Sequence, residues 1–298
     1  MTKLSDALAA GDFTVTAELG PPRQPNSAPV RETARRFAHI VHAANVTDNQ
    51  AATVKLSPVA CSAWMIEEGL DPILQVTTRD RNLLAIQADL LGAWALGVRS
   101  VLALSGDPLK VGPYAELSKP VGDLDSMGLL ELIVAMNSGR LAAGEELSEP
   151  TDFLILTAAN PLVDTVERLE KKVAAGAHAF QTNIVYDVDR FEEWLGPVIE
   201  AGITERAPML VGVTPPRSTR MLRHMHDNIP GIEVDERTFE RMEGLEGDEA
   251  KQAGIAIAVD VVARLSDVEA VAGVHLMAPG WEGDAVPAVI AGAGISAE

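Results

Sequence analysis

Short apolar runs rich in β-branched residues recur along the chain, and a longer stretch with helical periodicity follows most of them. This alternation is typical of repeated βα units around a parallel sheet. The pattern predicts eight strands, over residues 13–19, 40–47, 73–77, 100–104, 153–157, 179–184, 209–213 and 273–277.

The stretches between these strands predict amphipathic helices. Over residues 81–96, apolar side chains from Leu83 to Trp94 recur at spacings of three and four, which places them on one face. A second helix over residues 163–175 is followed by Gly176, the residue expected after a helix C-terminus. Further helices are predicted over residues 30–39, 60–68, 127–137, 189–201, 218–226 and 249–265.

The number of βα units favours a closed barrel. No linker or low-complexity stretch interrupts the series, and no Gly-x-Gly-x-x-Gly segment follows the first strand, which argues against a dinucleotide-binding open sheet. An open sheet of about six or seven strands would nevertheless give a similar pattern. We expect an α/β chain that forms one (β/α)₈ TIM-barrel domain over residues 1–298.

Composition excludes several classes of protein. A net charge of −19 disfavours nucleic-acid binding, and no apolar run approaches the roughly 20 residues that span a bilayer. The beginning of the chain lacks the apolar core of a secretory signal, so a cytoplasmic protein is expected. Cys61 is the only cysteine and is more typical of a small buried apolar residue than of a nucleophile. No spacing of potential ligands indicates a metal site.

Polar residues gather where the predicted strands end, which is where the chemistry of a barrel enzyme is found. Glu18 closes the first strand and precedes the rigid turn Gly20-Pro21-Pro22, which would fix its carboxylate at the barrel mouth. Taken alone, Glu18 is better explained as an exposed residue at a strand end.

The third strand leads into a segment with two arginines. Thr78 or Asp80 is expected to cap the helix that follows. Capping does not explain Arg79 and Arg81, because cations are disfavoured at the positive end of a helix dipole. Their position fits an anionic partner such as a cofactor pyrophosphate.

Three further strand ends carry candidate binding groups. Gly106 would let the backbone approach a ligand and would direct Asp107 to the mouth, although an ordinary Gly-Asp-Pro turn is an equal interpretation. Small residues at 158–160 leave room for a planar ring. The amides at 181–183 are suited to the edge of a heterocycle or to ordinary strand-end hydrogen bonding.

Taken in order, these segments resemble the methylenetetrahydrofolate reductase family, and the similarity extends from Phe13 to Gly294. The chain is most similar to the short bacterial branch, which consists of the catalytic barrel alone. The matching stretches are Ala17-Glu18-Leu19-Gly20-Pro21-Pro22, Val46-Thr47-Asp48-Asn49-Gln50, Gln75-Val76-Thr77-Thr78-Arg79-Asp80-Arg81-Asn82, Leu104-Ser105-Gly106-Asp107, Phe180-Gln181-Thr182-Asn183 and His275-Leu276-Met277-Ala278.

The resemblance implies a flavin, FAD or in some relatives FMN, at the C-terminal mouth of the barrel. Arg79 and Asn160 are expected in the same cofactor site. Lys171 and Lys172 would otherwise be a solvated helix face, and the resemblance assigns them to a phosphate or pyrophosphate. By position, the flavin contacts would be Thr47, Gln75, Thr77, Ser105, Gly106, Asp125, Ala158, Lys171 and Lys172.

The resemblance also implies a reaction, the reduction of 5,10-methylenetetrahydrofolate to 5-methyltetrahydrofolate with NAD(P)H as electron donor. Glu18 would protonate the folate nitrogen, and burial would raise its pKa. Asp107 would stabilise the iminium cation and bind the pterin. Gln181 and Asn183 would read the pterin, and Asn183 stands where many relatives carry a glutamine.

Two alternatives stay open at this point. Hydride transfer directly from a nicotinamide to the folate would need no flavin, and a non-catalytic chain would bind folate for a partner methyltransferase. The sequence does not distinguish NADH from NADPH or an electron-donating partner subunit. It also leaves open whether the chain forms a homo-oligomer and in which direction the reaction runs.

Overall fold

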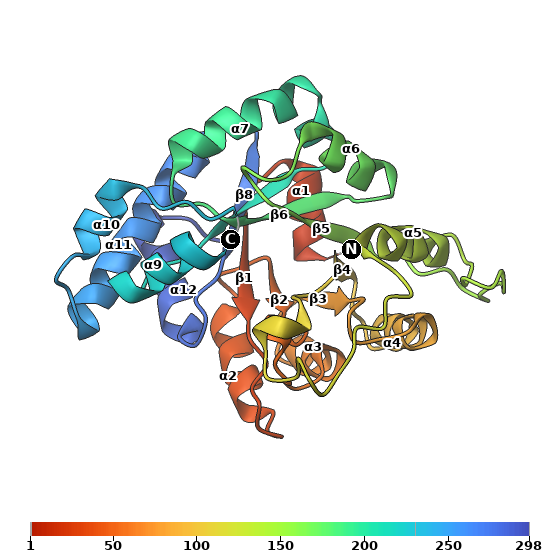
Figure 1. Cartoon of the computed structure of the whole chain (residues 1–298). Helices are drawn as coiled ribbons and strands as arrows, with labels where there is room; N and C mark the ends of the chain where they lie inside the picture. Colours follow the sequence, from red (N-terminus) through yellow and green to blue (C-terminus); the bar gives the residue numbers. More distant parts are fainter. Residues whose placement is uncertain (1, 230, 298) are drawn as a thin grey trace.

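A computed structural model describes residues 2–229 and 231–297, and its eight parallel strands close into a barrel in the order β1 to β8 (Figure 1). The barrel and all eight predicted strands are confirmed. The strands are β1 (Thr14–Leu19), β2 (Ala43–Val46), β3 (Pro72–Thr77), β4 (Ser100–Leu104), β5 (Leu154–Ala159), β6 (Ala179–Ile184), β7 (Met209–Val213) and β8 (Val271–Leu276).

Helices surround the barrel, and each of the eight predicted helices is confirmed within a few residues. Four helices within the described residues, α1, α8, α10 and α12, were not predicted from the sequence. Two of these have fewer than eight residues, and α12 contains Pro287, which obscures a helical pattern. The helices are α1 (Lys3–Ala10), α2 (Ala28–Phe37), α3 (Pro58–Glu67), α4 (Leu83–Ala95), α5 (Ser126–Asn137), α6 (Val166–Ala174), α7 (Val188–Glu200), α8 (Ile203–Arg206), α9 (Thr219–Asn228), α10 (Glu236–Met242), α11 (Gly247–Ser266) and α12 (Glu282–Ala293), with short 3₁₀ helices η1 (Gln50–Ala52) and η2 (Leu109–Val111).

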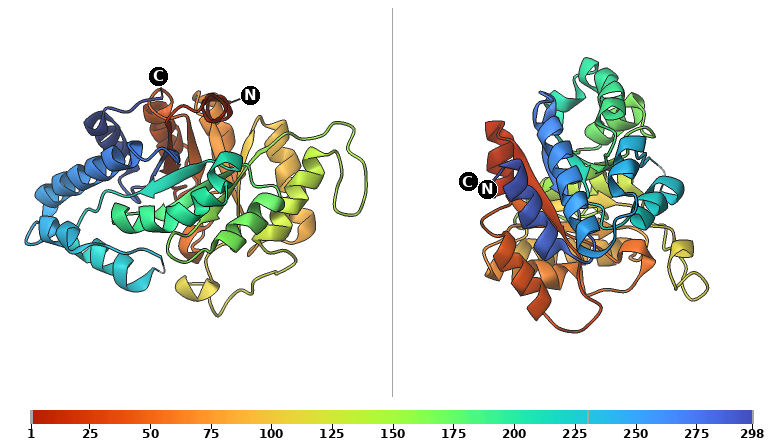
Figure 2. Two further views of the ribbon diagram at one scale, coloured as in Figure 1. Left: turned by 90° about the horizontal axis from the view of Figure 1, so that it is seen from above. Right: turned by 90° about the vertical axis from the view of Figure 1, so that its left-hand side faces the viewer.

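Alternation along the strands divides the side chains between two packed regions. In β1, Val15 and Leu19 pack outward with Phe37 of α2 in the core between strands and helices. Inside the barrel, Ile73 and Leu102 pack with Leu4 of α1. Helix α1 therefore closes the N-terminal end of the barrel with apolar side chains (Figure 2).

Towards the C-terminal mouth the interior of the barrel becomes polar. The amides of Asn45 and Gln181 bond each other twice, at 2.7 and 3.1 Å. Thr16 and His275 meet at 3.0 Å, and burial lowers the pKa of His275 to about 3, so that its ring is neutral. A layer of polar side chains that hydrogen-bond with one another therefore lies beneath the mouth of the barrel.

Two negative findings concern the described part of the chain. Within residues 2–229 and 231–297, no helix combines the length and apolar character needed to cross a bilayer. In the same ranges no three His, Cys, Asp or Glu side chains converge as metal ligands. The thiol of Cys61 is buried, and burial raises its pKa to about 12, which favours its interpretation as a small apolar core residue.

Candidate active site

The carboxyl group of Glu18 lies at the end of β1, where only 3% of the residue is exposed. Burial raises its pKa to about 7, and the charges of Glu282 and Asp107 act in the same direction. A side-chain hydrogen bond from Gln50 and the charge of Lys55 act in the opposite direction. The direction of the shift agrees with the sequence-based expectation, and the group is poised to exchange a proton near neutral pH.

Asp107 follows β4 and is brought to the same end of the barrel. Gly106 precedes it with φ 85°, and a Cβ at Gly106 would lie 3.0 Å from the Cβ of Thr77. This position therefore requires glycine. Asp107 Oδ2 accepts a hydrogen bond from the Ala51 amide at 2.6 Å. Because its charge raises the pKa of Glu18, the two carboxyl groups are electrostatically coupled.

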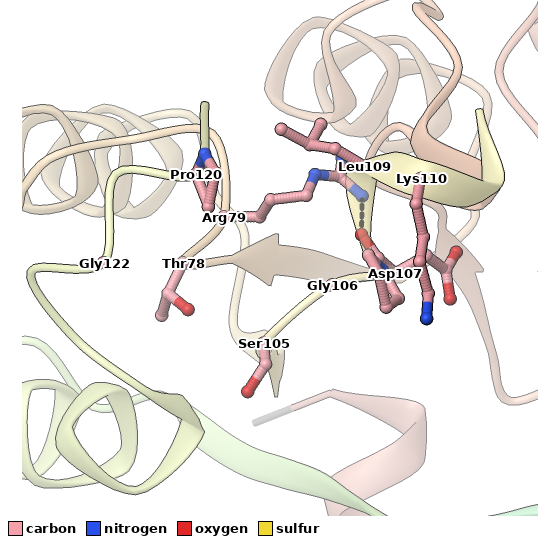
Figure 3. Close-up of a pocket in the computed structure, with 10 residues that line it drawn as sticks. Thr78, Arg79, Ser105, Gly106, Asp107, Leu109, Lys110, Pro120 and Gly122 are labelled. Carbon is pink, nitrogen blue, oxygen red and sulfur yellow. Dashed lines mark hydrogen bonds between the residues drawn. The ribbon is translucent and has the colours of Figure 1, made fainter. Parts of the chain in front are cut away.

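A cavity of about 410 Å³ opens beside Asp107 (Figure 3). Its volume lies within the range of small-molecule sites. The close-up shows Arg79 reaching from the end of β3 to the backbone oxygen of Asp107, at 2.9 Å. Four residues predicted for the site line the cavity, and the full lining is Thr78, Arg79, Ser105, Gly106, Asp107, Pro108, Leu109, Lys110, Pro120 and Gly122.

The two arginines at this edge have carboxylate partners within the protein. Arg79 binds Asp80 at 2.6 and 2.7 Å. Arg81 binds the buried Asp48 at 2.6 and 3.1 Å, and Asp89 at 2.8 Å. These pairs neutralise the cations, so that their position is explained without the pyrophosphate that the sequence suggested.

The cap of the following helix also differs from the expectation. Neither Thr78 nor Asp80 caps α4, because the helix begins later and Asn82 accepts the hydrogen bond from the Ala85 amide at 2.9 Å. Asp125, predicted to contact a flavin, caps α5 by accepting from the Gly128 amide at 2.8 Å. Capping is therefore an observed role of Asp125.

The adjacent lysines of α6 have different surroundings. The side chain of Lys171 is 66% exposed and pairs with Glu167. Lys172 is buried, and its Nζ donates to the backbone oxygen of Ala158 at 2.7 Å and to Asp164 at 3.0 Å. Only Lys172 is thus joined to a strand end at the barrel mouth.

The two amide residues predicted to contact the pterin, Gln181 and Asn183, differ in their surroundings. Gln181 is committed to Asn45 inside the barrel, whereas Asn183 is half-buried and accepts from the Ile184 amide at 2.8 Å. Asn160, predicted for the cofactor site, lies against the turn at Gly231. A Cβ added to Gly231 would come within 1.8 Å of the Oδ1 atom of Asn160. Asn183 is therefore the more accessible of the two amides at the end of β6.

The remaining predicted cofactor residues are buried near the ends of β2 and β3. Thr47 and Gln75 lie in the barrel wall, and Thr77 donates to Asp48 at 2.9 Å. Two residues near Glu18 were not singled out in the sequence, Lys55 and Glu282. No local signal identifies Glu282, because α12 comes beside β1 only when the barrel closes.

Comparison with known protein families gives one match over nearly the whole chain. The model described as methylenetetrahydrofolate reductase matches residues 3–290. Methylenetetrahydrofolate reductase 1 of Schizosaccharomyces pombe is 27% identical over 165 residues, which cover 54% of this chain and 25% of that protein. A probable methylenetetrahydrofolate reductase (NADPH) of Caenorhabditis elegans is 24% identical over 217 residues, which cover 72% of this chain and 31% of that protein.

A solved structure shares the fold. An uncharacterized protein from Clostridium thermocellum that binds two copies of 5-methyl-5,6,7,8-tetrahydrofolic acid superposes with a TM-score of 0.64 and 14% identity. The match covers 97% of this chain and 96% of that protein. The alignments to the two curated relatives, in contrast, cover only about a quarter to a third of their lengths.

Proposed function

Because the chain belongs to the methylenetetrahydrofolate reductase family, we propose that it reduces the methylene group of 5,10-methylenetetrahydrofolate to the methyl group of 5-methyltetrahydrofolate. One observation carries the proposal. Glu18 is a buried carboxyl group with a pKa of about 7, coupled to a second carboxylate at the mouth of the barrel. This pair provides an acid and a counter-ion for the two charge changes of the reaction.

The chemistry assigns a different task to each carboxyl group. Opening the methylene bridge requires a proton on the folate nitrogen and produces an iminium cation that accepts hydride. Glu18, half protonated near pH 7, supplies the proton, and Asp107 stabilises the cation and binds the pterin. Asn183, half-buried at the end of β6, is the amide that would contact the pterin edge.

We propose that a flavin, FAD or FMN, binds as cofactor at the cavity beside Asp107. Its volume suits a ligand ring, and Ser105 and the Gly106 backbone offer polar contacts to the ring edge. Lys110 lines the same cavity and provides a cation for a phosphate. When bound, the flavin would carry hydride from NAD(P)H to the folate.

The replacement Glu18→Gln tests the assignment of the acid. We expect the folate half-reaction to slow by roughly 10²- to 10⁴-fold, the usual contribution of a positioned acid, while reduction of the flavin by NAD(P)H is unchanged. Stopped-flow absorbance measures each half-reaction separately. Glu200→Gln, an exposed carboxyl at the end of α7, is the matched control. Equal loss of both half-reactions would exclude Glu18 as the specific acid.

One observation favours a second candidate, direct hydride transfer from NAD(P)H without a flavin. The three cations predicted for the cofactor, Arg79, Lys171 and Lys172, all pair with carboxylates of the protein. An absorbance spectrum of the purified protein separates the candidates. A colourless protein that binds neither FAD nor FMN and still turns over would establish the direct route, whereas flavin bands that bleach with NAD(P)H would exclude it. A chain that binds the folate but does not turn it over would indicate a folate carrier.

A further inference from the structure

One short segment, residues 49–52, holds both carboxyl groups of the site. The side chain of Gln50 forms a hydrogen bond with Glu18. The next residue, Ala51, donates its backbone amide to Asp107 Oδ2 at 2.6 Å. The groups assigned to the folate are therefore already engaged by the protein's own chain.

This segment has an unfavourable backbone conformation. Asn49, Ala51 and Ala52 have φ of 47°, 53° and 49°, the left-handed region that residues with a Cβ rarely adopt. Hydrogen bonds hold it there, since Arg79 Nη2 donates to the oxygen of Asn49 at 3.2 Å and the Lys55 amide donates to Asn49 Oδ1 at 3.0 Å. Strain of this kind persists only where the surroundings enforce it, and it is frequent at functional sites.

A second loop covers the segment from outside. Gly112 follows η2, and a Cβ at this position would lie 2.3 Å from the backbone oxygen of Ala52 and 2.7 Å from that of Ala51. The loop from β4 that carries Gly112 also supplies Asp107 and much of the cavity lining. The segment is thus confined between the carboxyl groups and this loop.

We propose that residues 49–52 form a latch that the folate must displace, with Gln50 as the positioning residue that holds Glu18 until the substrate takes its place. The proposal rests on the function proposed above, in which the folate needs both carboxyl groups. Segment and folate then compete for the same atoms. Release of three left-handed residues offsets part of the cost of opening, so that the strained latch is held closed without blocking the site permanently.

Two substitutions are expected to shift the latch in opposite directions. Ala51→Gly removes the conformational strain, stabilises the closed latch, and should raise KM for the folate roughly fivefold with a much smaller change in kcat. Gly112→Ala places a methyl group against the segment and should lower KM. Ala143→Gly, in an exposed loop without a left-handed φ, is the matched control. An unchanged KM in Ala51→Gly would overturn the latch, whether or not Gly112→Ala folds.

Hydrogen exchange provides a readout without turnover. In the wild-type protein with 5-methyltetrahydrofolate, the Ala51 amide should exchange faster than in the free protein, because its bond to Asp107 is broken. Unchanged or slower exchange, with binding verified by calorimetry, would overturn the latch and leave the proposed function intact. Failure of the wild type to bind any folate would overturn the proposed function and the latch with it.

Discussion

Glu18 and Lys172 are both buried at the mouth of the barrel, where 3% of Glu18 and 6% of Lys172 is exposed. The two residues differ in the charges of their neighbours. The ammonium of Lys172 lies 3.0 Å from Asp164 and also donates to a backbone oxygen. The carboxyl of Glu18 has two other carboxylates, Glu282 and Asp107, as neighbours. The positive charge of Lys55 counteracts their effect on the pKa of Glu18, but its influence is the smallest among the surrounding groups.

The difference separates a structural ion pair from a reactive group. Burial lowers the pKa of Lys172, but Asp164 counteracts that shift, so the pair can stay ionised. Burial raises the pKa of Glu18, and Glu282 and Asp107 increase the shift. Folds compensate buried charges wherever function allows, so a buried carboxyl whose pKa is raised further by neighbouring carboxylates indicates a site where stability is lost in favour of reactivity.

The largest expected effect tests the structural side of the comparison. Lys172→Met should lower the free energy of unfolding by about 3–5 kcal/mol, because among the described residues it leaves the buried carboxylate of Asp164 with only the exposed Arg168 as a cationic partner. Lys171→Met is the control and should change stability by less than about 0.5 kcal/mol, since its pair with Glu167 is exposed. Urea denaturation measures both. Equal losses of stability in the two variants would contradict the structural role of the buried pair. Loss of cofactor binding without loss of stability would instead support Lys172 as a cofactor contact.

The next largest effect is a gain in stability, and it tests the interpretation of Glu18 as the reactive group. Folding raises the pKa of Glu18 from its ordinary value of 4.5 to about 7, so the contribution of this group to stability is highest below pH 4.5 and falls as the pH rises to 7. Above pH 7 the wild type is about 3 kcal/mol less stable than it would be with a neutral group at this position. Glu18→Gln should therefore stabilise the protein by that amount at pH 8 and by little at pH 4, as measured by denaturation at each pH. Destabilisation at pH 8 would show that the charge is compensated after all.

The sequence predicts the barrel and the place of the two carboxyl groups for one physical reason. Parallel strands of a closed barrel all end at the same rim, so residues that follow strands meet there however far apart they are in the chain. Glu18 and Asp107 obey this rule. Short apolar runs rich in β-branched residues mark the strands themselves, which is why all eight were found.

The partners of the charged residues could not be predicted in the same way. Lys171 and Lys172 are neighbours in the chain, yet one turns outward and the other inward, because consecutive helical residues point about 100° apart. Arg81 finds Asp48 across 33 positions. Such pairings depend on side-chain packing between strand ends, and no local pattern encodes them.

The smallest expected effect is a change in the pH dependence of the folate half-reaction. It sharpens the comparison because it identifies the groups that shift the pKa of Glu18. If Glu18 must be protonated, the folate half-reaction should be constant well below pH 7 and fall about tenfold per unit above it, while reduction of a bound flavin should lack this limb. Glu282→Gln removes a charge that raises the pKa of Glu18 and should move the limb to lower pH, whereas Lys55→Gln should move it to higher pH. Pre-steady-state rates measured from pH 5 to about pH 9 give each limb. Displacement of both variants in the same direction would indicate a change in packing around Glu18, because only electrostatic coupling makes the sign of the shift follow the sign of the charge removed.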